Sequence, residues 1–172
     1  MKLMPVFTSE AISKRVKELG EQITQDYKEK DLIVVCVLKG AFMFFADLVR
    51  EIKLDLEVDF VRLSSYANKT SSSGKVVFSK DIEISVEGKH LLLVEDIVDT
   101  GHSMAYLKKV LTARKAKSVK ICALIDKRER REIDVQVDYV GFSLEKGFIV
   151  GYGLDYAEQY RNLSGVFELK FN

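Results

Sequence analysis

Residues 91–104 read Leu-Leu-Leu-Val-Glu-Asp-Ile-Val-Asp-Thr-Gly-His-Ser-Met, and the rest of the chain can be arranged around them. The four aliphatic residues at 91–94 predict a strand buried on both faces, because a half-exposed strand would alternate apolar and polar residues. The adjacent carboxylates of Glu95 and Asp96 are costly to bury without partners. We therefore expect the strand to end at Val94, with both acids at its carboxyl edge.

A short loop and a helix follow the acids. Residues 99–103 combine small, polar and Gly residues, which suits a backbone that turns and offers its N–H groups. Apolar residues then recur at helical spacing over 104–111, which predicts a helix that starts near His102 or Ser103. The order of strand, acidic pair, loop and helix N-terminus predicts an anion site beside a place for a metal or a sugar.

The string from Val94 to Ser103 resembles the ribose-phosphate-binding signature of the type I phosphoribosyltransferases. That signature has hydrophobic residues, two acids, two more hydrophobic residues, Asp-Thr-Gly and a hydroxyl residue. An isolated Asp-Thr-Gly is often only a turn and a helix cap, whereas the longer pattern is much more specific. The resemblance implies an α/β fold, with a twisted, mostly parallel sheet flanked by helices and a small hood.

Length and composition favour one globular domain over residues 1–172. The chain is 47% hydrophobic and 31% charged, with a formal net charge of +1, so no basic field indicates a nucleic-acid partner. No apolar run is long enough to cross a membrane, and the N-terminus lacks a signal-peptide pattern. Cys36 and Cys122 lie in aliphatic runs and are expected to be buried thiols. We expect a cytoplasmic protein without a membrane partner.

The remaining segments alternate between strand and helix patterns, which predicts a mostly parallel sheet. Helices are expected after a cap at Thr8 or Ser9 and over 41–52. The expected strands are 32–38, 56–63, 76–78, 82–84, 119–125, the alternating segment 133–137, 139–142 and 148–152. Residues 64–74 are polar and rich in serine, so we expect a mobile loop there. The hood is expected to combine the N-terminal segment with residues after about Lys127.

Transfer from a 5-phosphoribosyl 1-pyrophosphate donor would need three kinds of group. The loop at 99–103 offers N–H groups to the 5-phosphate. Glu95 and Asp96 offer hard oxygen ligands to the ribose hydroxyls and to Mg²⁺. Lys39-Gly40, at the end of another predicted parallel strand, is placed to bind the leaving pyrophosphate if the two strands are neighbours.

Several further segments resemble the hypoxanthine(-guanine) phosphoribosyltransferases, and they occur in that family's order. These segments are Leu38-Lys39-Gly40, Ser65-Tyr66, the central signature, Lys127 and Phe148 to Tyr156. The last of them is specific to the branch of the family that uses 6-oxopurines. Together the matches span the chain from about Leu32 to Arg161. His102 occupies a loop position where family members often carry Lys.

The resemblance implies a role for each matching residue. The residues implied for phosphate and ribose are Glu95, Asp96, Asp99, Thr100, Gly101, His102 and Ser103, with Asp99 as the catalytic acid or base at purine N7. Those implied for pyrophosphate are Lys39, Gly40 and Arg161, with a cis peptide bond before Gly40. Ser65 and Tyr66 would belong to a lid. Those implied for the purine are Lys127 at the 6-oxo group, Phe148 by stacking, Ile149 and Asp155. Glu95, Asp96 and Asp155 would hold Mg²⁺.

The predicted function is purine salvage, in which hypoxanthine or guanine reacts with phosphoribosyl pyrophosphate to give IMP or GMP and pyrophosphate. One alternative is a relative that prefers xanthine or adenine. Another is a regulatory protein of the same fold that binds RNA, which the near-neutral charge does not favour. The relative preference among hypoxanthine, guanine and xanthine stays open. The resemblance also implies a homodimer or a homotetramer.

Overall fold

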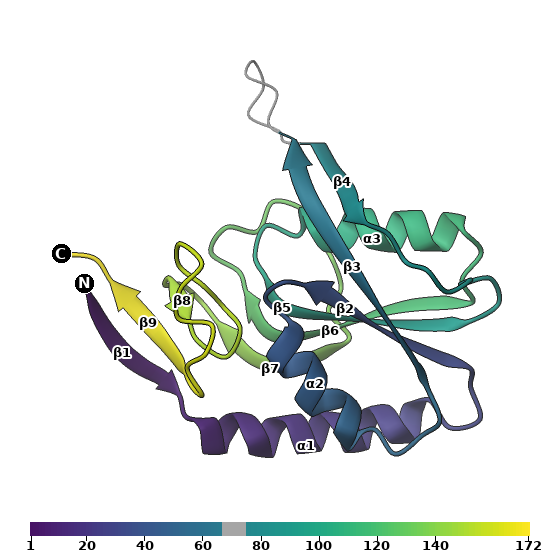
Figure 1. Ribbon diagram of the computed structural model, residues 1–172, viewed down its shortest axis with the longest axis horizontal. Coiled ribbons are helices and arrows are strands. Elements are labelled where there is room, and N and C mark those ends of the chain that lie inside the picture. Colours follow the sequence, from purple (N-terminus) through teal and green to yellow (C-terminus); the bar gives the residue numbers. More distant parts are fainter. Residues whose placement is uncertain (67–74) are drawn as a thin grey trace.

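The computed structural model describes residues 1–66 and 75–172, which form an α/β fold around a six-stranded sheet (Figure 1). The strand order is β4-β3-β2-β5-β6-β7, and every neighbouring pair is parallel except β3 and β4. The strands are β2 (Leu32–Leu38), β3 (Glu57–Tyr66), β4 (Lys75–Lys80), β5 (His90–Val98), β6 (Ser118–Lys127) and β7 (Tyr139–Leu144). The predicted mostly parallel sheet is confirmed.

A second, antiparallel sheet combines the two ends of the chain, which lie side by side at one end of the molecule (Figure 1). Its order is β1-β9-β8, and its strands are β1 (Lys2–Phe7), β9 (Val166–Lys170) and β8 (Ile149–Val150). We call this sheet and the loops between β8 and β9 the hood. Because β7 still belongs to the main sheet, the C-terminal part of the hood begins later than the expected boundary near Lys127.

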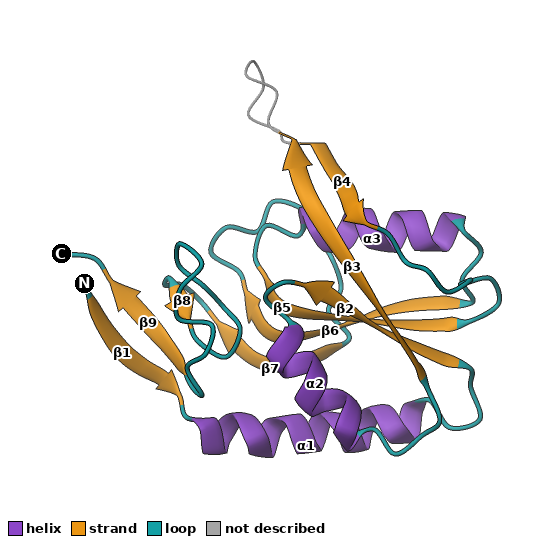
Figure 2. Ribbon diagram, in the orientation of Figure 1, coloured by secondary structure: helices purple, strands orange, loops and turns teal. Residues whose placement is uncertain are grey.

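Helices cover the main sheet, as Figure 2 shows. They are α1 (Ser9–Asp26), α2 (Phe42–Glu51) and α3 (His102–Ala113). Alternate residues of β5 enter two separate cores: Leu92 packs in the cluster that contains α1 and α2, and Leu93 packs in the one that contains α3. Both are fully buried, so the predicted burial of this strand on two faces is confirmed.

The first helix is capped at its N-terminus and is bound to the main sheet by one arginine. Thr8 caps α1, because its side-chain oxygen accepts a hydrogen bond from the N–H of Ala11 at 3.1 Å. Arg15, on the first half of the helix, donates from Nε to the carbonyl of Gly141 at 3.0 Å and from Nη2 to that of Val140 at 2.7 Å. These bonds tie α1 to the edge strand β7 beneath it.

Several predicted element bounds are wrong. Strand β5 does not end at Val94 but continues to Val98, because its parallel pairing with β6 continues to that residue. Ser64 to Tyr66 complete β3 and pair with β4, so they are not part of a loop. The rest of the predicted loop, 67–74, lies outside the described residues. Only Ile149–Val150 of the predicted strand 148–152 is extended, and 133–137 is irregular. The buried thiols of Cys36 and Cys122 are confirmed.

The segment 82–84 is not a strand because its N–H groups bind a side chain instead. The buried carboxylate of Asp59 accepts hydrogen bonds from the N–H groups of Phe60, Glu83 and Ile84 at 2.7, 2.7 and 2.9 Å. Burial alone would raise the pKa of this carboxyl group. The three N–H groups and the Lys80 ammonium outweigh burial, so the pKa of Asp59 is lowered.

Asp59→Asn is therefore expected to lower the free energy of unfolding by about 1–3 kcal/mol at pH 7, because buried N–H groups lose a charged acceptor. Since the native pKa is lowered, this stabilisation is present above the unfolded pKa and is lost as pH falls through the native value. Urea unfolding of the wild type and the variant across the acid range tests this. Asp55→Asn, at an exposed carboxylate nearby, is the control. A difference that persists in strong acid would contradict the assignment.

Candidate active site

The candidate site lies where β2, β5 and β6 end and where the hood approaches the main sheet. Gly40 follows β2 and is packed so closely against Asp96 of β5 that an added Cβ would overlap Oδ2 of that carboxylate. A Cβ on Gly153, in the hood, would collide with the carbonyl of Gly40. Gly153 has φ of +101°, a conformation that favours glycine. These contacts bring the predicted pyrophosphate loop, the acidic pair and the hood together.

The two acids differ in exposure: Glu95 is buried and Asp96 is half-buried. Glu95 is 9% exposed, and its Oε1 accepts a hydrogen bond from the N–H of Asp96 at 3.0 Å. Burial, followed by the adjacent charge of Asp96, raises the pKa of Glu95 well above its ordinary value. Burial also raises the pKa of Asp96, against the opposing effects of hydrogen bonds and of the nearby Arg161 charge.

The acidic pair could hold a metal. Neither carboxylate has an ion-pair partner within 4.0 Å among the described residues, and the Arg161 charge that acts on Asp96 lies beyond that distance. No described cation therefore pairs directly with either acid. A divalent cation with oxygen ligands would supply a compensating charge. Outside residues 67–74, no group of three or more His, Cys, Asp or Glu side chains is assembled that could hold a metal. The pair therefore fits a cation that takes its remaining ligands from substrate and water.

The predicted phosphate loop connects β5 to α3, whose first residue is His102 as predicted. Gly101 precedes the helix with φ of +92°, and a Cβ there would collide with the carbonyl of Ile133. The Thr100 carbonyl accepts hydrogen bonds from the N–H groups of Glu132 and Ile133 at 2.9 and 3.0 Å. Nε2 of His102 lies 2.5 Å from the carboxylate of Glu132. The loop is thus packed against the irregular segment 131–133.

Asp99 has one oxygen that no group in the described part of the chain satisfies. Its Oδ1 is buried without a hydrogen-bond partner, whereas Oδ2 lies 3.5 Å from Nη1 of Arg130. A buried acceptor without a hydrogen-bond partner is rare in native structures, so its presence needs an explanation. Oδ1 could accept a proton or a hydrogen bond from a bound molecule.

The predicted pyrophosphate groups lie together, although they are far apart in the sequence. Lys39 Nζ is 3.0 Å from Oε2 of Glu158, and Arg161 Nη2 is 3.3 Å from Oε1 of the same carboxylate. Arg161 also donates to the carbonyl of Gly153 at 2.7 Å and lies 3.4 Å from Asp155. Lys39, Arg161 and Asp155 are therefore gathered beside Gly40.

The cis peptide bond lies one residue earlier than predicted. It joins Leu38 to Lys39, not Lys39 to Gly40. The two residues predicted to belong to a lid, Ser65 and Tyr66, are the last residues of β3. Residues 67–74, which follow them, lie outside the described residues. The lid stays a prediction.

Of the residues expected to bind the purine, Lys127 is the last residue of β6, and Phe148 directly precedes β8. Lys127 is only 6% exposed, so it is not a solvated surface lysine. Its Nζ lies 3.9 Å from Oε2 of Glu129, and the same oxygen accepts a hydrogen bond from the N–H of Gly147 at 3.3 Å. Glu129 thereby links Lys127 to the residue before Phe148. The Lys127 ammonium is beyond hydrogen-bond distance of Glu129, so its donors could serve a ligand.

Phe148 is 43% exposed, which is unusual for a residue in a hydrophobic run, whereas Ile149 is buried in the core. The Phe148 ring contacts those of Tyr156 and Phe171 edge-on, with centroids 5.7 and 5.8 Å apart. Edge-on contacts fix a ring without covering both of its faces. Phe148 could therefore present a face to a flat ligand.

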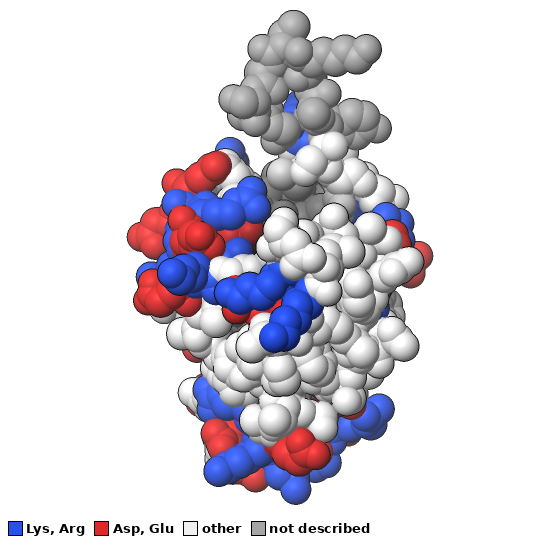
Figure 3. Space-filling model, turned by 90° about the vertical axis from the view of Figure 1, so that its left-hand side faces the viewer, with Lys and Arg blue, Asp and Glu red and all other residues white. Residues whose placement is uncertain are grey.

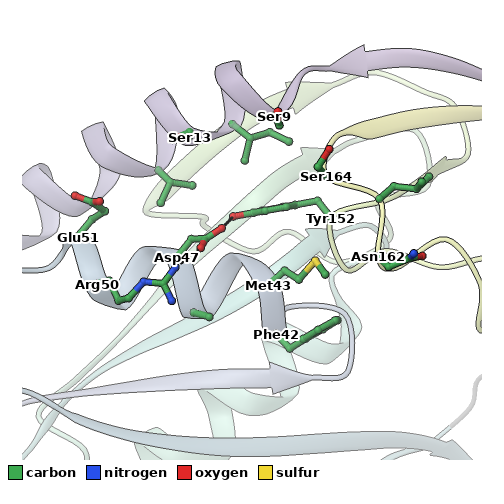
Figure 4. A pocket seen from close by; sticks show the side chains of 14 residues that line it. Ser9, Ser13, Phe42, Met43, Asp47, Arg50, Glu51, Tyr152, Asn162 and Ser164 are labelled. Atoms are coloured by element: carbon green, nitrogen blue, oxygen red, sulfur yellow. Dashed lines mark hydrogen bonds and ion pairs between the residues drawn. The ribbon is translucent and has the colours of Figure 1, made fainter.

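The hood loop is anchored to α2 at a second place. The hydroxyl of Tyr152 donates to the carboxylate of Asp47, which also binds Nη2 of Arg50 at 2.6 Å. Figure 4 shows these side chains around a hollow of about 690 Å³ between α1, α2 and the hood. None of the predicted site residues lines this hollow. Its polar contacts fix Tyr152, and the next residue, Gly153, packs against Gly40.

Three residues of the site were missed by sequence reasoning: Glu158, Tyr152 and Arg131, whose guanidinium donates to the carbonyls of Val98 and Asp99. Glu158 and Arg131 lie in highly charged segments, where a single charge does not stand out. Tyr152 lies in the recognised segment, but its contact with Asp47 is 105 residues away. No local pattern indicates such contacts.

Gly40→Ala is expected to displace the Asp96 carboxylate, because the new Cβ would overlap Oδ2. Loss of an oriented carboxylate at a metal site typically costs about 10–100-fold in metal affinity or activity. Titration with Mn²⁺ in the presence of pyrophosphate measures the effect. Gly88→Ala is the control, because that position has φ of +74° but open space around it. Metal affinity equal to that of the wild type would show that the close packing has no functional role.

Comparison with known proteins defines the class first. Residues 6–157 match the family model of the phosphoribosyl transferase domain, which agrees with the sheet order and with the loop after β5. A hypoxanthine-guanine phosphoribosyltransferase of Bacillus subtilis is 48% identical over 165 residues, covering 96% of this chain and 92% of the relative. One from Streptococcus thermophilus is 47% identical over the same shares.

Solved structures agree. A hypoxanthine phosphoribosyltransferase from Staphylococcus aureus superposes with a TM-score of 0.92 at 43% identity, covering 96% of this chain and 90% of the other. A hypoxanthine-guanine phosphoribosyltransferase from Bacillus anthracis, solved with HEPES in its active site, gives 0.91 at 44% identity, with coverage of 96% and 98%. The chain belongs to the hypoxanthine-guanine phosphoribosyltransferase family.

Proposed function

We propose that this chain transfers the 5-phosphoribosyl group from phosphoribosyl pyrophosphate to hypoxanthine or guanine, which gives IMP or GMP and pyrophosphate in purine salvage. The observation that carries the proposal is the meeting of three binding elements at one edge of the sheet. Gly40 lies against Asp96, Gly153 lies against Gly40, and the loop at 99–103 leaves the same strand as Asp96. A donor with two separated phosphate groups needs this arrangement.

The residues divide the work by chemistry. The N–H groups of 99–103 bind the 5-phosphate, while Lys39, Gly40 and Arg161 bind the pyrophosphate. N9 of the purine forms a bond to C1 of the ribose as the bond from C1 to the pyrophosphate oxygen breaks, and the electron pair leaves with pyrophosphate. The purine then holds one proton too many, and Asp99 accepts it at N7 through the oxygen that is buried without a partner.

Glu95, Asp96 and Asp155 are proposed to hold Mg²⁺, which would stabilise charge on the pyrophosphate as the bond breaks. The fit rests on two adjacent carboxylates whose pKa values burial raises and which lack a cation partner among the described residues. Asp155 is connected to the acidic pair by Arg161, which lies 3.4 Å from Asp155 and whose charge acts against the raised pKa of Asp96. Mn²⁺ titration of Asp155→Asn tests whether this carboxylate binds the metal.

Base recognition is assigned to Lys127, Phe148, Ile149 and Asp155. The ammonium of Lys127 donates to the 6-oxo group, the Phe148 ring stacks on the purine, and backbone groups near Ile149 and Asp155 read the far edge. The buried position of Lys127 and the exposed ring of Phe148 support these roles.

The charges on the hood face favour an enzyme over the alternative of an RNA-binding regulator. Figure 3 shows this face, where positive and negative side chains are intermingled beside a broad area without charge. On the described part of this face there is no continuous basic surface of the kind that binds a phosphate backbone. Among residues 1–66 and 75–172, no helix is long and apolar enough to cross a membrane.

The test is a direct assay. The protein is incubated with phosphoribosyl pyrophosphate, Mg²⁺ and either hypoxanthine or guanine, and the products are identified by chromatography and mass. IMP or GMP should form together with an equal amount of pyrophosphate, and chelation of Mg²⁺ should stop the reaction. Failure to form either nucleotide from folded protein would refute the proposal. The homodimer or homotetramer stays a prediction, which analytical ultracentrifugation can test.

A further inference from the structure

The side chain of Arg131 donates hydrogen bonds to backbone carbonyls at the start of the phosphate loop. This side chain is 14% exposed, and its guanidinium contacts the ends of both β5 and β6. Nε donates to the carbonyl of Asp99 at 2.8 Å, and Nη2 donates to the carbonyl of Val98 at 3.1 Å. Nη2 also lies 2.5 Å from Oδ1 of Asp126 and 3.1 Å from the carbonyl of Lys127.

The neighbouring peptide is held from the same side. The Thr100 carbonyl accepts hydrogen bonds from the N–H groups of Glu132 and Ile133, which follow Arg131 directly. Three successive carbonyls, at residues 98, 99 and 100, are therefore all bound by the segment 131–133.

These contacts determine the direction in which the backbone N–H groups of the loop point. In a trans peptide, the carbonyl of one residue and the N–H of the next point in opposite directions. Because segment 131–133 holds the carbonyls of 98–100, the N–H groups of 99–101 face the opposite side of the loop. Successive N–H groups with a common direction form a concave anion site.

We propose that Arg131 is a positioning residue of the phosphate loop: its guanidinium holds the carbonyls of Val98 and Asp99 so that the loop N–H groups face the 5-phosphate of the ribosyl substrate. The same guanidinium joins this loop to the strand end that carries Lys127. The proposal rests on the proposed function, because it takes a 5-phosphate as the bound group.

The buried carboxylate of Asp126 keeps the guanidinium in place. Asp126 is 3% exposed and binds two arginines, Arg131 at 2.5 Å and Arg128 at 3.1 Å. Arg128 is 69% exposed on its side chain, and among the described residues it has no hydrogen bond to a carbonyl of the phosphate loop. The chain thus offers two arginines that share one carboxylate, of which one contacts the loop.

The test compares Arg131→Lys with Arg128→Lys. Lysine keeps the positive charge beside Asp126 but is a point donor, so it cannot reproduce the planar fork that binds two carbonyls. Calorimetric titration of each variant with IMP, and separately with pyrophosphate and Mg²⁺, gives the dissociation constants. Arg131→Lys should weaken IMP binding by about 10–100-fold, the range typical when a group that orients a binding residue is lost. Pyrophosphate binding should be nearly unchanged.

Arg128→Lys should leave both affinities nearly unchanged, and thermal unfolding should show that all proteins are folded at the temperature of titration. Equal weakening of IMP and pyrophosphate by Arg131→Lys would indicate a general structural role and overturn the proposal. So would unchanged IMP affinity in folded Arg131→Lys. If the wild type neither bound IMP nor formed it, the proposed function would be refuted, and the role of Arg131 with it. That result concerns the wild type, so it differs from the two outcomes for Arg131→Lys.

Discussion

Asp99→Asn is expected to lower turnover by about 10²–10⁴-fold, the usual cost of removing a general acid or base. The amide has nearly the same shape as the carboxylate but cannot accept the purine proton. Binding of phosphoribosyl pyrophosphate should persist, because the backbone carbonyl of Asp99 is still held by Arg131 and the loop keeps its conformation. Steady-state kinetics gives the turnover, and calorimetric titration gives the donor affinity.

Asp134→Asn is a suitable control for this variant, since Asp134 is an exposed carboxylate on the segment beside the phosphate loop. Its turnover should match that of the wild type. Turnover of Asp99→Asn close to that of the wild type would remove Asp99 from the mechanism. Oδ1 of Asp99, which is buried and has no hydrogen-bond partner among the described residues, would then need another explanation.

Adenine is expected to be a substrate at a level about 10⁴–10⁵-fold below hypoxanthine and guanine in kcat/KM. A 6-oxopurine presents an acceptor at position 6, whereas adenine presents an amino donor there, and the Lys127 ammonium has only donors. Sites built around such a hydrogen bond reject analogues that lack the matching group by factors of that size. The burial of Lys127 strengthens the expectation, because water cannot replace the lost bond freely.

Lys127→Ala should lower kcat/KM for hypoxanthine and guanine by about 10–100-fold. This loss corresponds to a hydrogen bond to a charged group worth about 1.5–3 kcal/mol. The difference in kcat/KM between these bases and adenine should therefore become smaller. Lys120→Ala, at an exposed lysine of the same strand, is the matched control and should change neither base. Efficient turnover of adenine by the wild type would show that another residue governs base choice.

Much of the main sheet could be predicted, because its strands carry the signal in their own residues. Aliphatic runs such as Leu91 to Val94 are buried on both faces and lie in the centre of the sheet, as expected. The helix that starts at His102 follows from its apolar spacing in the same way. Each of these features depends on residues that are close together in sequence.

The predicted bounds of strands were wrong where they depend on contacts with residues far away in the sequence. The rule that acids end a buried strand failed at Glu95, because β6 continues to pair with β5 and the site accepts a raised pKa. The segment 82–84 looked like a strand, but the Asp59 carboxylate takes two of its N–H groups. Such outcomes depend on contacts that periodicity does not encode.

The candidate site divides in the same way. The signature at 94–103 and Lys39-Gly40 could be recognised from local sequence, and the structure places Gly40 against Asp96. The contacts of Lys39 with Glu158 and of Arg131 with the carbonyl of Asp99 join residues 119 and 32 positions apart. Only the folded chain reveals which charged side chains of such segments reach the site.

A crystal structure with IMP, pyrophosphate and Mn²⁺ would show where each part of the substrates binds, because anomalous scattering locates the metal and the ligands mark each subsite. We predict the 5-phosphate on the N–H groups of 99–103, the purine between Phe148 and Lys127, pyrophosphate at Lys39-Gly40 and Arg161, and the metal within reach of Asp96. A nucleotide phosphate bound at another loop, or a purine that contacts neither Phe148 nor Lys127, would contradict the account.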